Sequence, residues 1–224
     1  MSFRAMSFRA ISVNRKLPLI LMIVANAILV TCLWLEHRDR VARNKTVADC
    51  IDVRTPAETA IAACSDVVGA SPKAVWAYTN RGLAYSSRGD QDRAIDDLDM
   101  AIGLDRGYAR AYAIRATAYN AKGNWDRGIV DLTKAIELNP GDAQSYSNRA
   151  AAYMVRGKTD LAIADTTRAI ALNPRLAPAY DNRAVAYEKK GRIDLAIADY
   201  RSTLAIEPHD RNGRDGLKRL SAAH

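Results

Sequence analysis

Cysteine and histidine are scarce in this chain of 224 residues, which contains three of each. Three cysteines are too few for a fold that depends on a disulfide framework. The histidines, His37, His209 and His224, have no metal-binding spacing, and the sequence has no HExxH, GxSxG or phosphate-binding Walker motif. We therefore expect no catalytic residue, no metal and no cofactor, and we predict that the protein is not an enzyme.

Acidic residues are fewer than basic ones, but the imbalance is local. The formal net charge is +8, and residues 1–45 contain eight Lys or Arg against two acidic residues. Residues 46–224 contain 25 basic and 23 acidic residues, which is close to balance. This larger part also has no arginine and aromatic platform on one face, as a nucleic-acid-binding surface would. Nucleic acid is therefore not the expected partner.

A long uncharged run, Leu17 to Leu35, interrupts the basic end. Nineteen helical residues span roughly 28 Å, about one hydrocarbon core, so the run predicts a transmembrane signal anchor. A buried helix of a soluble fold is the alternative, although no partner for such a helix is evident. We expect a single-pass protein of the bacterial inner (cytoplasmic) membrane with its repeats in the periplasm. The alternatives are cytoplasmic repeats, because Lys and Arg are equally frequent on both sides, or cleavage near Ala25 and secretion.

The sequence after the basic end repeats every 34 residues. Four segments align: YTNRGLAY from 78, YAIRATAY from 112, YSNRAAAY from 146 and YDNRAVAY from 180. A glycine follows each segment, and apolar residues at spacings of three and four continue beyond it. This pattern predicts two helices joined by a glycine turn in each unit. One such unit cannot bury its apolar face alone, so neighbouring units must stack.

This repeat resembles the tetratricopeptide repeat (TPR) family. The matching features are tyrosine at unit positions 4 and 11, Gly or Ala at 8, a small residue at 20 and, in three units, proline at 32. The resemblance covers residues 75–210. It implies an all-α, right-handed superhelical solenoid of helix-turn-helix TPR units, here preceded by one transmembrane helix.

Position 7 departs from the family, which usually has leucine there. We expect the aliphatic parts of these arginines to pack while their heads reach solvent or a neighbouring carboxylate. The acidic residues beside the second helices are expected on a solvated face. The residues concerned are Arg81, Arg115, Arg149 and Arg183, and Asp92, Asp96, Asp97 and Asp99.

Two cysteines occupy a segment that continues the repeat register upstream. Cys50 and Cys64 fall on the two predicted helices of this degenerate unit, and we predict a disulfide between them, with two buried thiols as the alternative.

The predicted organisation is a basic leader 1–16, a membrane anchor 17–35, a juxtamembrane linker 36–48, a degenerate unit 49–74, four TPR units 75–108, 109–142, 143–176 and 177–210, and a capping helix with a tail 211–224.

The resemblance also implies a function. In this family, position 6 of the first helix faces a concave groove, and asparagine there can both donate to and accept from a peptide backbone. We predict a membrane-anchored scaffold that binds a peptide or helix of a protein partner. The alternatives are an assembly protein that forms homo-oligomers through its repeats or membrane helix, and a non-catalytic regulatory subunit. The predicted groove residues are Asn80, Asn148 and Asn182, with Trp76, Thr79, Arg110, Asn120, Gln144, Ser147 and Asp181 at neighbouring positions.

Overall fold

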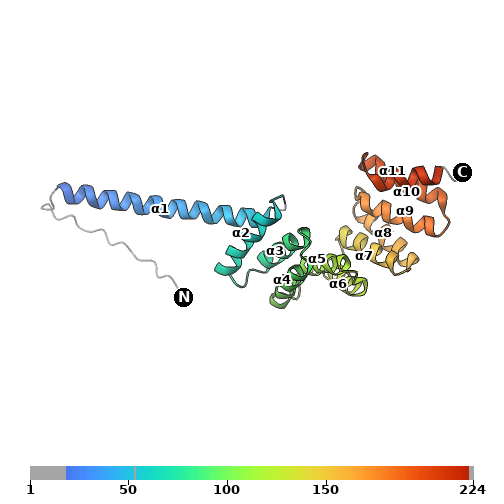
Figure 1. Cartoon of the computed structure of the whole chain (residues 1–224), viewed down its shortest axis with the longest axis horizontal. Helices are drawn as coiled ribbons and strands as arrows, with labels where there is room; N and C mark the ends of the chain where they lie inside the picture. Colours follow the sequence, from blue (N-terminus) through green and yellow to red (C-terminus); the bar gives the residue numbers. More distant parts are fainter. Residues whose placement is uncertain (1–18, 53, 222–224) are drawn as a thin grey trace. The chain divides into compact units, whose positions relative to one another are not determined.

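The structure is a computed structural model that describes residues 19–52 and 54–221, with side chains from Val30 onward (Figure 1). The chain divides into two compact units, residues 1–45 and residues 46–224, which we treat separately. The predicted basic leader 1–16, the first two residues of the predicted anchor and the last three residues of the tail lie outside the described residues.

Helix α1, Leu19–Ile51, corrects the predicted location. From Glu36 onward this helix carries exposed charged residues. In the part of the chain that the structure describes, no helix is long and apolar enough to cross a membrane. The predicted single-pass location in the inner membrane is therefore wrong by this finding, and the periplasmic placement that depended on it falls with it. Residues 36–48, expected as a linker, are helical.

The second unit is built from short helices connected in pairs (Figure 1). Each pair consists of a first helix of 13 residues and a second helix of 14. The helices are α2 (Ala57–Ala70), α3 (Val75–Ser87), α4 (Gln91–Leu104), α5 (Ala109–Ala121), α6 (Trp125–Leu138), α7 (Ala143–Val155), α8 (Thr159–Leu172), α9 (Ala177–Lys189), α10 (Ile193–Ile206) and α11 (Arg211–Ser221). The all-α repeat solenoid predicted from the sequence is confirmed for this unit.

A glycine ends the turn inside each pair because the backbone there has a positive φ. Gly89 has φ 87° and Gly191 has φ 68°, values that side-chain-bearing residues adopt only with strain. In two pairs the following residue, Asp90 or Asn124, then accepts a hydrogen bond from the backbone N–H of residue 93 or 127. This cap satisfies one of the unpaired donors at the start of the second helix. One helix therefore ends and the next begins within a few residues.

Small residues allow the helices of a pair to approach closely. At unit positions 8 and 20, Ala116, Ala150 and Ala162 are fully buried. At Gly82 even one added Cβ would lie 2.9 Å from Leu98 Cγ. The core is consequently rich in alanine, and the burial of each unit depends on the units on either side of it.

Candidate functional site: the inner face of the first helices

The first helices of successive units pack on one another, α3 with α5, α5 with α7 and α7 with α9. In the described part of the chain, successive second helices have no comparable packing. First helices are therefore closer together than second helices, so the stack curves with its first helices on the inner, concave side. We call the exposed and half-exposed side of α3, α5, α7 and α9 the inner face.

The three predicted groove asparagines have different environments on this face. Asn80 is nine-tenths buried, and its Oδ1 has no hydrogen-bond partner among the described residues. Asn148 is half-buried and accepts a 2.8 Å hydrogen bond from Gln144 Nε2. Asn182 donates through Nδ2 to the backbone oxygen and to Oγ of Ser147, both at 3.2 Å. Asn182 thus joins two first helices, whereas the half-buried Asn148 can offer its amide to a ligand.

The other predicted groove residues are not gathered into one site. Arg110 is exposed, and Trp76 is half-buried against the apolar cluster that contains the cysteines. The side chain of Asn120 turns toward the second helix of its own unit, since a Cβ at Gly128 would lie 1.9 Å from Asn120 Oδ1. Two further expected groove positions, Thr79 and Ser147, are fully buried.

Asp181 is buried between the last pair of helices and α11. Burial raises the pKa of Asp181 to about 6, and the like charge of Asp210 contributes in the same direction. Its Oδ1 has no partner within the described residues. Asp181 therefore links the docking of α11 to protonation.

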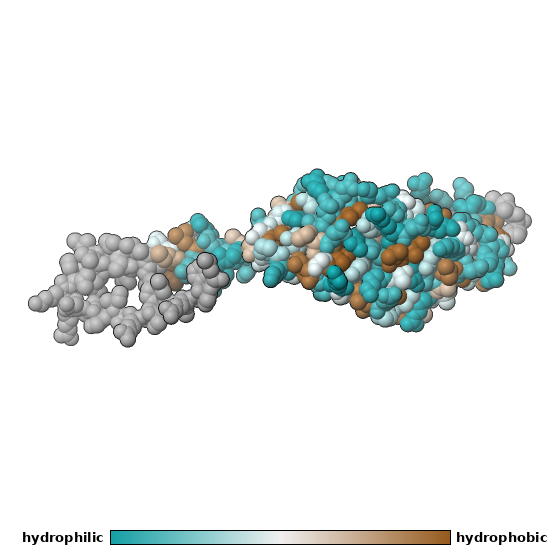
Figure 2. Space-filling view, turned by 90° about the horizontal axis from the view of Figure 1, so that it is seen from below, coloured by the Kyte–Doolittle hydropathy of each residue, from teal (hydrophilic) through white to brown (hydrophobic). Residues whose placement is uncertain are grey.

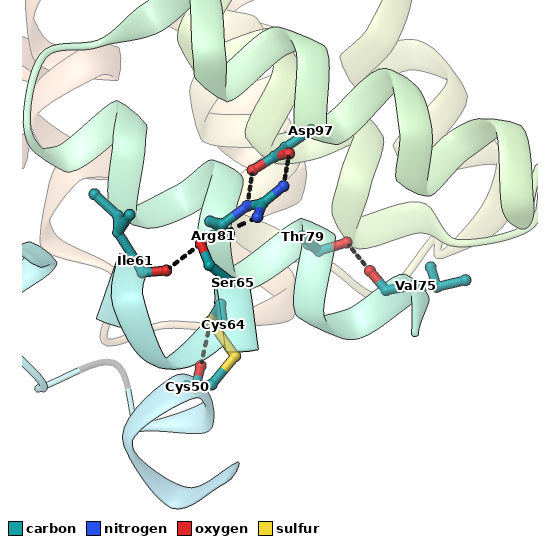
Figure 3. The surroundings of a disulfide bond; sticks show 8 residues. All are labelled: Cys50, Ile61, Cys64, Ser65, Val75, Thr79, Arg81 and Asp97. Atoms are coloured by element: carbon teal, nitrogen blue, oxygen red, sulfur yellow. Dashed lines mark hydrogen bonds and ion pairs between the residues drawn. A yellow bond between two sulfur atoms is a disulfide. The ribbon is translucent and has the colours of Figure 1, made fainter. Parts of the chain in front are cut away.

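The arginines at position 7 form a ladder that the sequence analysis only partly anticipated. Each binds an aspartate of its own unit through two nitrogens, as Arg81 does to Asp97 at 2.7 and 2.7 Å (Figure 3). These aspartates are buried, so the prediction that Asp97 is solvated was wrong. The recurrence of Arg at position 7 and Asp sixteen residues later was a signal that could have identified the pairs: Arg81–Asp97, Arg115–Asp131, Arg149–Asp165 and Arg183–Asp199.

The third nitrogen of each arginine reaches the second helix of the preceding unit. Arg81 Nη1 donates to Ser65 Oγ at 3.1 Å, and Arg149 Nη1 donates to Thr133 Oγ1 at 3.1 Å. Each guanidinium also lies over a tyrosine ring, Arg149 at 5.7 Å from Tyr146. The aspartate holds the pKa of Arg149 above its ordinary value, so the pair stays charged. One side chain therefore connects both helices of its unit and the neighbouring unit.

A disulfide closes the first, degenerate pair. Cys50 and Cys64 are joined with an S–S distance of 2.07 Å, and Figure 3 shows this bond near Ser65 and the first arginine of the ladder. Cys32 is exposed and unbridged. No group of three or more His, Cys, Asp or Glu side chains in the described part of the chain could hold a metal ion.

The surface is mainly polar, and its apolar residues are dispersed. Figure 2 shows hydrophilic residues over most of the displayed face of the second unit, with small hydrophobic patches between them. On the inner face the exposed apolar residues include Val155 and Val185, and on the outer side of α6 they include Val130. Such separate patches favour contact with a short segment rather than a broad hydrophobic interface.

The architecture defines the chain as a helical-hairpin repeat protein. Models of the tetratricopeptide repeat match residues 77–108, 109–142, 143–176 and 177–210, which make up more than half of the chain. The chain therefore belongs to the tetratricopeptide repeat family, as the sequence motifs indicated.

Solved structures of this family are similar to the chain over most of its repeats. The crystal structure of MamA is 30% identical, with a TM-score of 0.60 over 68% of this chain and 89% of that one. The first TPR domain of Spaghetti (RPAP3), bound to the HSP90 peptide SRMEEVD, is 29% identical, with a TM-score of 0.50 over 51% and 94%. YrrB, described as a TPR protein with an unusual peptide-binding site, is 20% identical, with a TM-score of 0.59 over 72% and 84%, and shares the fold. No curated protein matches the sequence.

Proposed function

We propose that this protein is a scaffold that binds an extended segment of a partner protein along its inner face. The observation that carries the proposal is a stripe on α7 formed by Gln144, Asn148, Ala151 and Val155. These residues are spaced by four, three and four, so they lie on one side of the helix, and each is exposed or half-exposed.

The stripe has the chemistry that an extended peptide requires. The amides of Gln144 and Asn148 bond to each other, and each can exchange that bond for a peptide N–H or C=O at little net cost. Val155, 56% exposed, supplies apolar contact about two turns beyond Asn148. The similar RPAP3 domain was solved with a bound peptide, which supports the same use of the fold here.

The charge of the inner face favours a partner segment without a strong charge. Arg110 and Lys189 are its exposed cations, and Asp181 is buried. A single exposed cation per helix does not make the paired cationic clamp that a terminal carboxylate needs. Self-assembly and a role as a regulatory subunit stay predictions, since no contact on the inner face favours either.

Peptide binding and its location can be tested with one set of variants. Peptides selected by phage display on the full-length chain would be labelled and titrated by fluorescence anisotropy. We expect the double variant Asn148→Ala, Val155→Asp to weaken binding about ten-fold or more, because it removes an amide partner and places a charge in the apolar patch. The matched control is Val130→Asp, which changes another exposed valine, 67% against 56%, on the outer side. Equal loss in both variants, or no loss in the first, would place binding elsewhere.

A further inference from the structure

Successive second helices leave room between them on the outer side of the array. The first helices α3 and α5 pack on one another, whereas α4 and α6 have no extensive packing in the part of the chain that the structure describes. A hollow of about 350 Å³ lies there, and residues of both α4 and α6 line it. This volume is near the lower end of the ~300–1,000 Å³ typical of ligand pockets, so it has room for one side chain. We call this hollow the outer groove, and the residues that matter below are Ile95, Asp96, Asp99, Tyr119, Lys122 and Arg127.

Each wall of the outer groove carries a charge without a counter-charge. Asp96, on α4, is exposed and has no hydrogen bond or ion pair with any described residue. Arg127, on α6, lies over the ring of Tyr119 at 5.5 Å, and no carboxylate in the described part of the chain pairs with its guanidinium. The two charges face the same hollow without bonding to each other, so a ligand between them can satisfy both.

The other charged side chains of the outer groove already have partners. Lys122 binds Asp92, and Asp99 accepts a hydrogen bond from Arg115. The unmatched charges that remain for a ligand on these walls are therefore one carboxylate on α4 and one guanidinium on α6. A complementary ligand must bring a cation to the first and a hydrogen-bond acceptor to the second.

The later units do not repeat these two charges. The residues equivalent to Asp96 are Val130 and Ala164, and those equivalent to Arg127 are Leu161 and Leu195. Helix pairs of the same kind form in those units with uncharged residues at both positions. The two charges are therefore not required to build the fold, and they distinguish the groove between α4 and α6 from the grooves that follow it.

A single lysine of a protein segment supplies both complementary groups. Its ammonium ion can pair with Asp96, and its main-chain carbonyl can accept a hydrogen bond from Arg127. The methylene stem between them can pack on Ile95, which lines the same hollow. Because one exposed ion pair contributes little by itself, we expect binding to depend on the three contacts together.

We propose that the outer groove binds a lysine side chain of a partner protein segment, with the ammonium ion on Asp96 and the adjoining main-chain carbonyl on Arg127. This inference goes beyond the proposed function, because the site is formed by second helices and not by the inner face. The chain then has two binding surfaces, which can hold two segments at the same time.

The direct test is an NMR titration of the full-length chain with N-acetyl-L-lysine N-methylamide. We expect saturable shifts of the backbone amides of Asp96 and Asp99 and of the ring signals of Tyr119. Higher salt should weaken this binding, because the ion pair is exposed and therefore screened. Absence of saturable shifts at these residues would overturn the proposal.

Two analogues of the probe separate its contacts. N-acetyl-L-norleucine N-methylamide has a similar stem without the ammonium ion, and n-pentylamine has the ammonium ion without the carbonyl. Each should bind about five-fold more weakly than the lysine probe, because each loses one polar contact. Equal binding of the norleucine analogue would exclude the ion pair with Asp96. Equal binding of pentylamine would make a free amine, and not a protein segment, the ligand.

Exposed substitutions test the two charged residues with little risk to folding. Asp96→Asn should weaken the lysine probe about five-fold, whereas Asp66→Asn, at an exposed and unpaired position on α2, should leave it unchanged. Arg127→Leu introduces the residue that the last two units have at this position and should weaken the probe about three-fold. Wild-type affinity in both groove variants, with helical circular dichroism intact, would refute the site.

One further variant separates the outer groove from the inner face. The double variant Asn148→Ala, Val155→Asp should bind the lysine probe as the wild type does, because neither residue lines the outer groove. Loss of the probe in this variant would place the lysine on the inner face and overturn the proposal. Conversely, display-selected peptides that bind the inner face should bind Asp96→Asn normally, so either surface can fail without the other.

Discussion

At the scale of single residues, the arginine at position 7 replaces a leucine contact of the family with a buried ion pair. Arg149 and Asp165 are paired at 2.7 and 2.9 Å, and both side chains are at least 85% buried. Such a pair stabilises weakly as a whole, yet each partner depends on the other, because an unpaired buried charge is costly. The ladder therefore contributes more to the alignment of the helices than to the free energy of unfolding.

This arrangement predicts strong coupling in a double-mutant cycle. Asp165→Leu and Arg149→Leu should each lower the free energy of unfolding by about 2–3 kcal/mol, because each leaves the other partner without its counter-charge. Replacing both residues by leucine should bring stability back to within about 1 kcal/mol of wild type. Urea unfolding of the four proteins measures both values.

The control for this cycle is Glu137→Gln, which removes the exposed partner of Lys134. Its effect should stay under about 0.5 kcal/mol, since exposed pairs contribute little. Additive losses from the two leucine substitutions would show that Arg149 and Asp165 act independently, contrary to the ladder.

Asp181 predicts a pH dependence of opposite sign to that of most aspartates. Its folded pKa, about 6, lies above the ordinary value of 3.8, so the folded state holds the proton more tightly. The stability that this group contributes is complete below about pH 4 and is lost as the pH rises through about 6. Asp181→Asn should therefore stabilise the protein at pH 7.5, on the order of 2 kcal/mol, and have little effect at pH 3.5.

Thermal melting at the two pH values checks this difference. Asp210 and Asn212, near the start of α11, and Thr203 on α10 are the groups that interact with Asp181. Asp92→Asn, at an exposed position, is the matched substitution and should show no such pH dependence. A gain from Asp181→Asn that is equal at both pH values would contradict the raised pKa.

At the scale of helices, the sequence predicted the positions of the helix pairs better than it predicted the environments of individual side chains. The 34-residue period and the four glycines located the helix pairs, because these signals are local and repeat in register. Asp97 could not be placed from its own helix, where Asp96 and Asp99 are exposed, because its counter-charge comes from a residue sixteen positions earlier. Asn120 was misplaced for a similar reason: the space that it occupies exists only because residue 128 is glycine.

The capping helix α11 also depends on a glycine that leaves room for a neighbouring side chain. A Cβ at Gly216 would lie 2.5 Å from the ring of Tyr200, which is buried and hydrogen-bonded to Glu188. Arg219 of α11 binds the same glutamate at 2.7 Å. Gly216→Ala should thus displace α11 and cost about 2 kcal/mol of unfolding free energy, measured by urea denaturation.

The matched control is Gly103→Ala in α4, where nothing lies within 4 Å of an added Cβ. This substitution should stabilise the protein by up to about 1 kcal/mol, because alanine is the better helix former. If both alanines changed stability alike, helix propensity and not the contact with Tyr200 would account for the result.

At the scale of the whole array of repeats, the extensive packing between helix pairs of residues 54–221 joins neighbouring pairs. Helix α2 packs on α3, and no extensive packing of α2 on any later helix occurs in the described part of the chain. Stability in such an array is the sum of local terms, so a change at one end decays along the array. The cysteine bond is therefore expected to stabilise the first pair and not the centre.

Hydrogen exchange of the oxidised and reduced full-length chain tests this locality. Opening the 14-residue separation between Cys50 and Cys64 removes about 3 kcal/mol in the chain-entropy model, which corresponds to roughly a hundred-fold faster exchange. We expect that acceleration in α2, whereas α7 and α8 should change less than about two-fold, because two complete pairs lie between them and the bond. Cys32→Ser prevents new bridges to the third cysteine without altering the first pair. Uniform acceleration along α2 to α10 would mean that the array unfolds as one cooperative body.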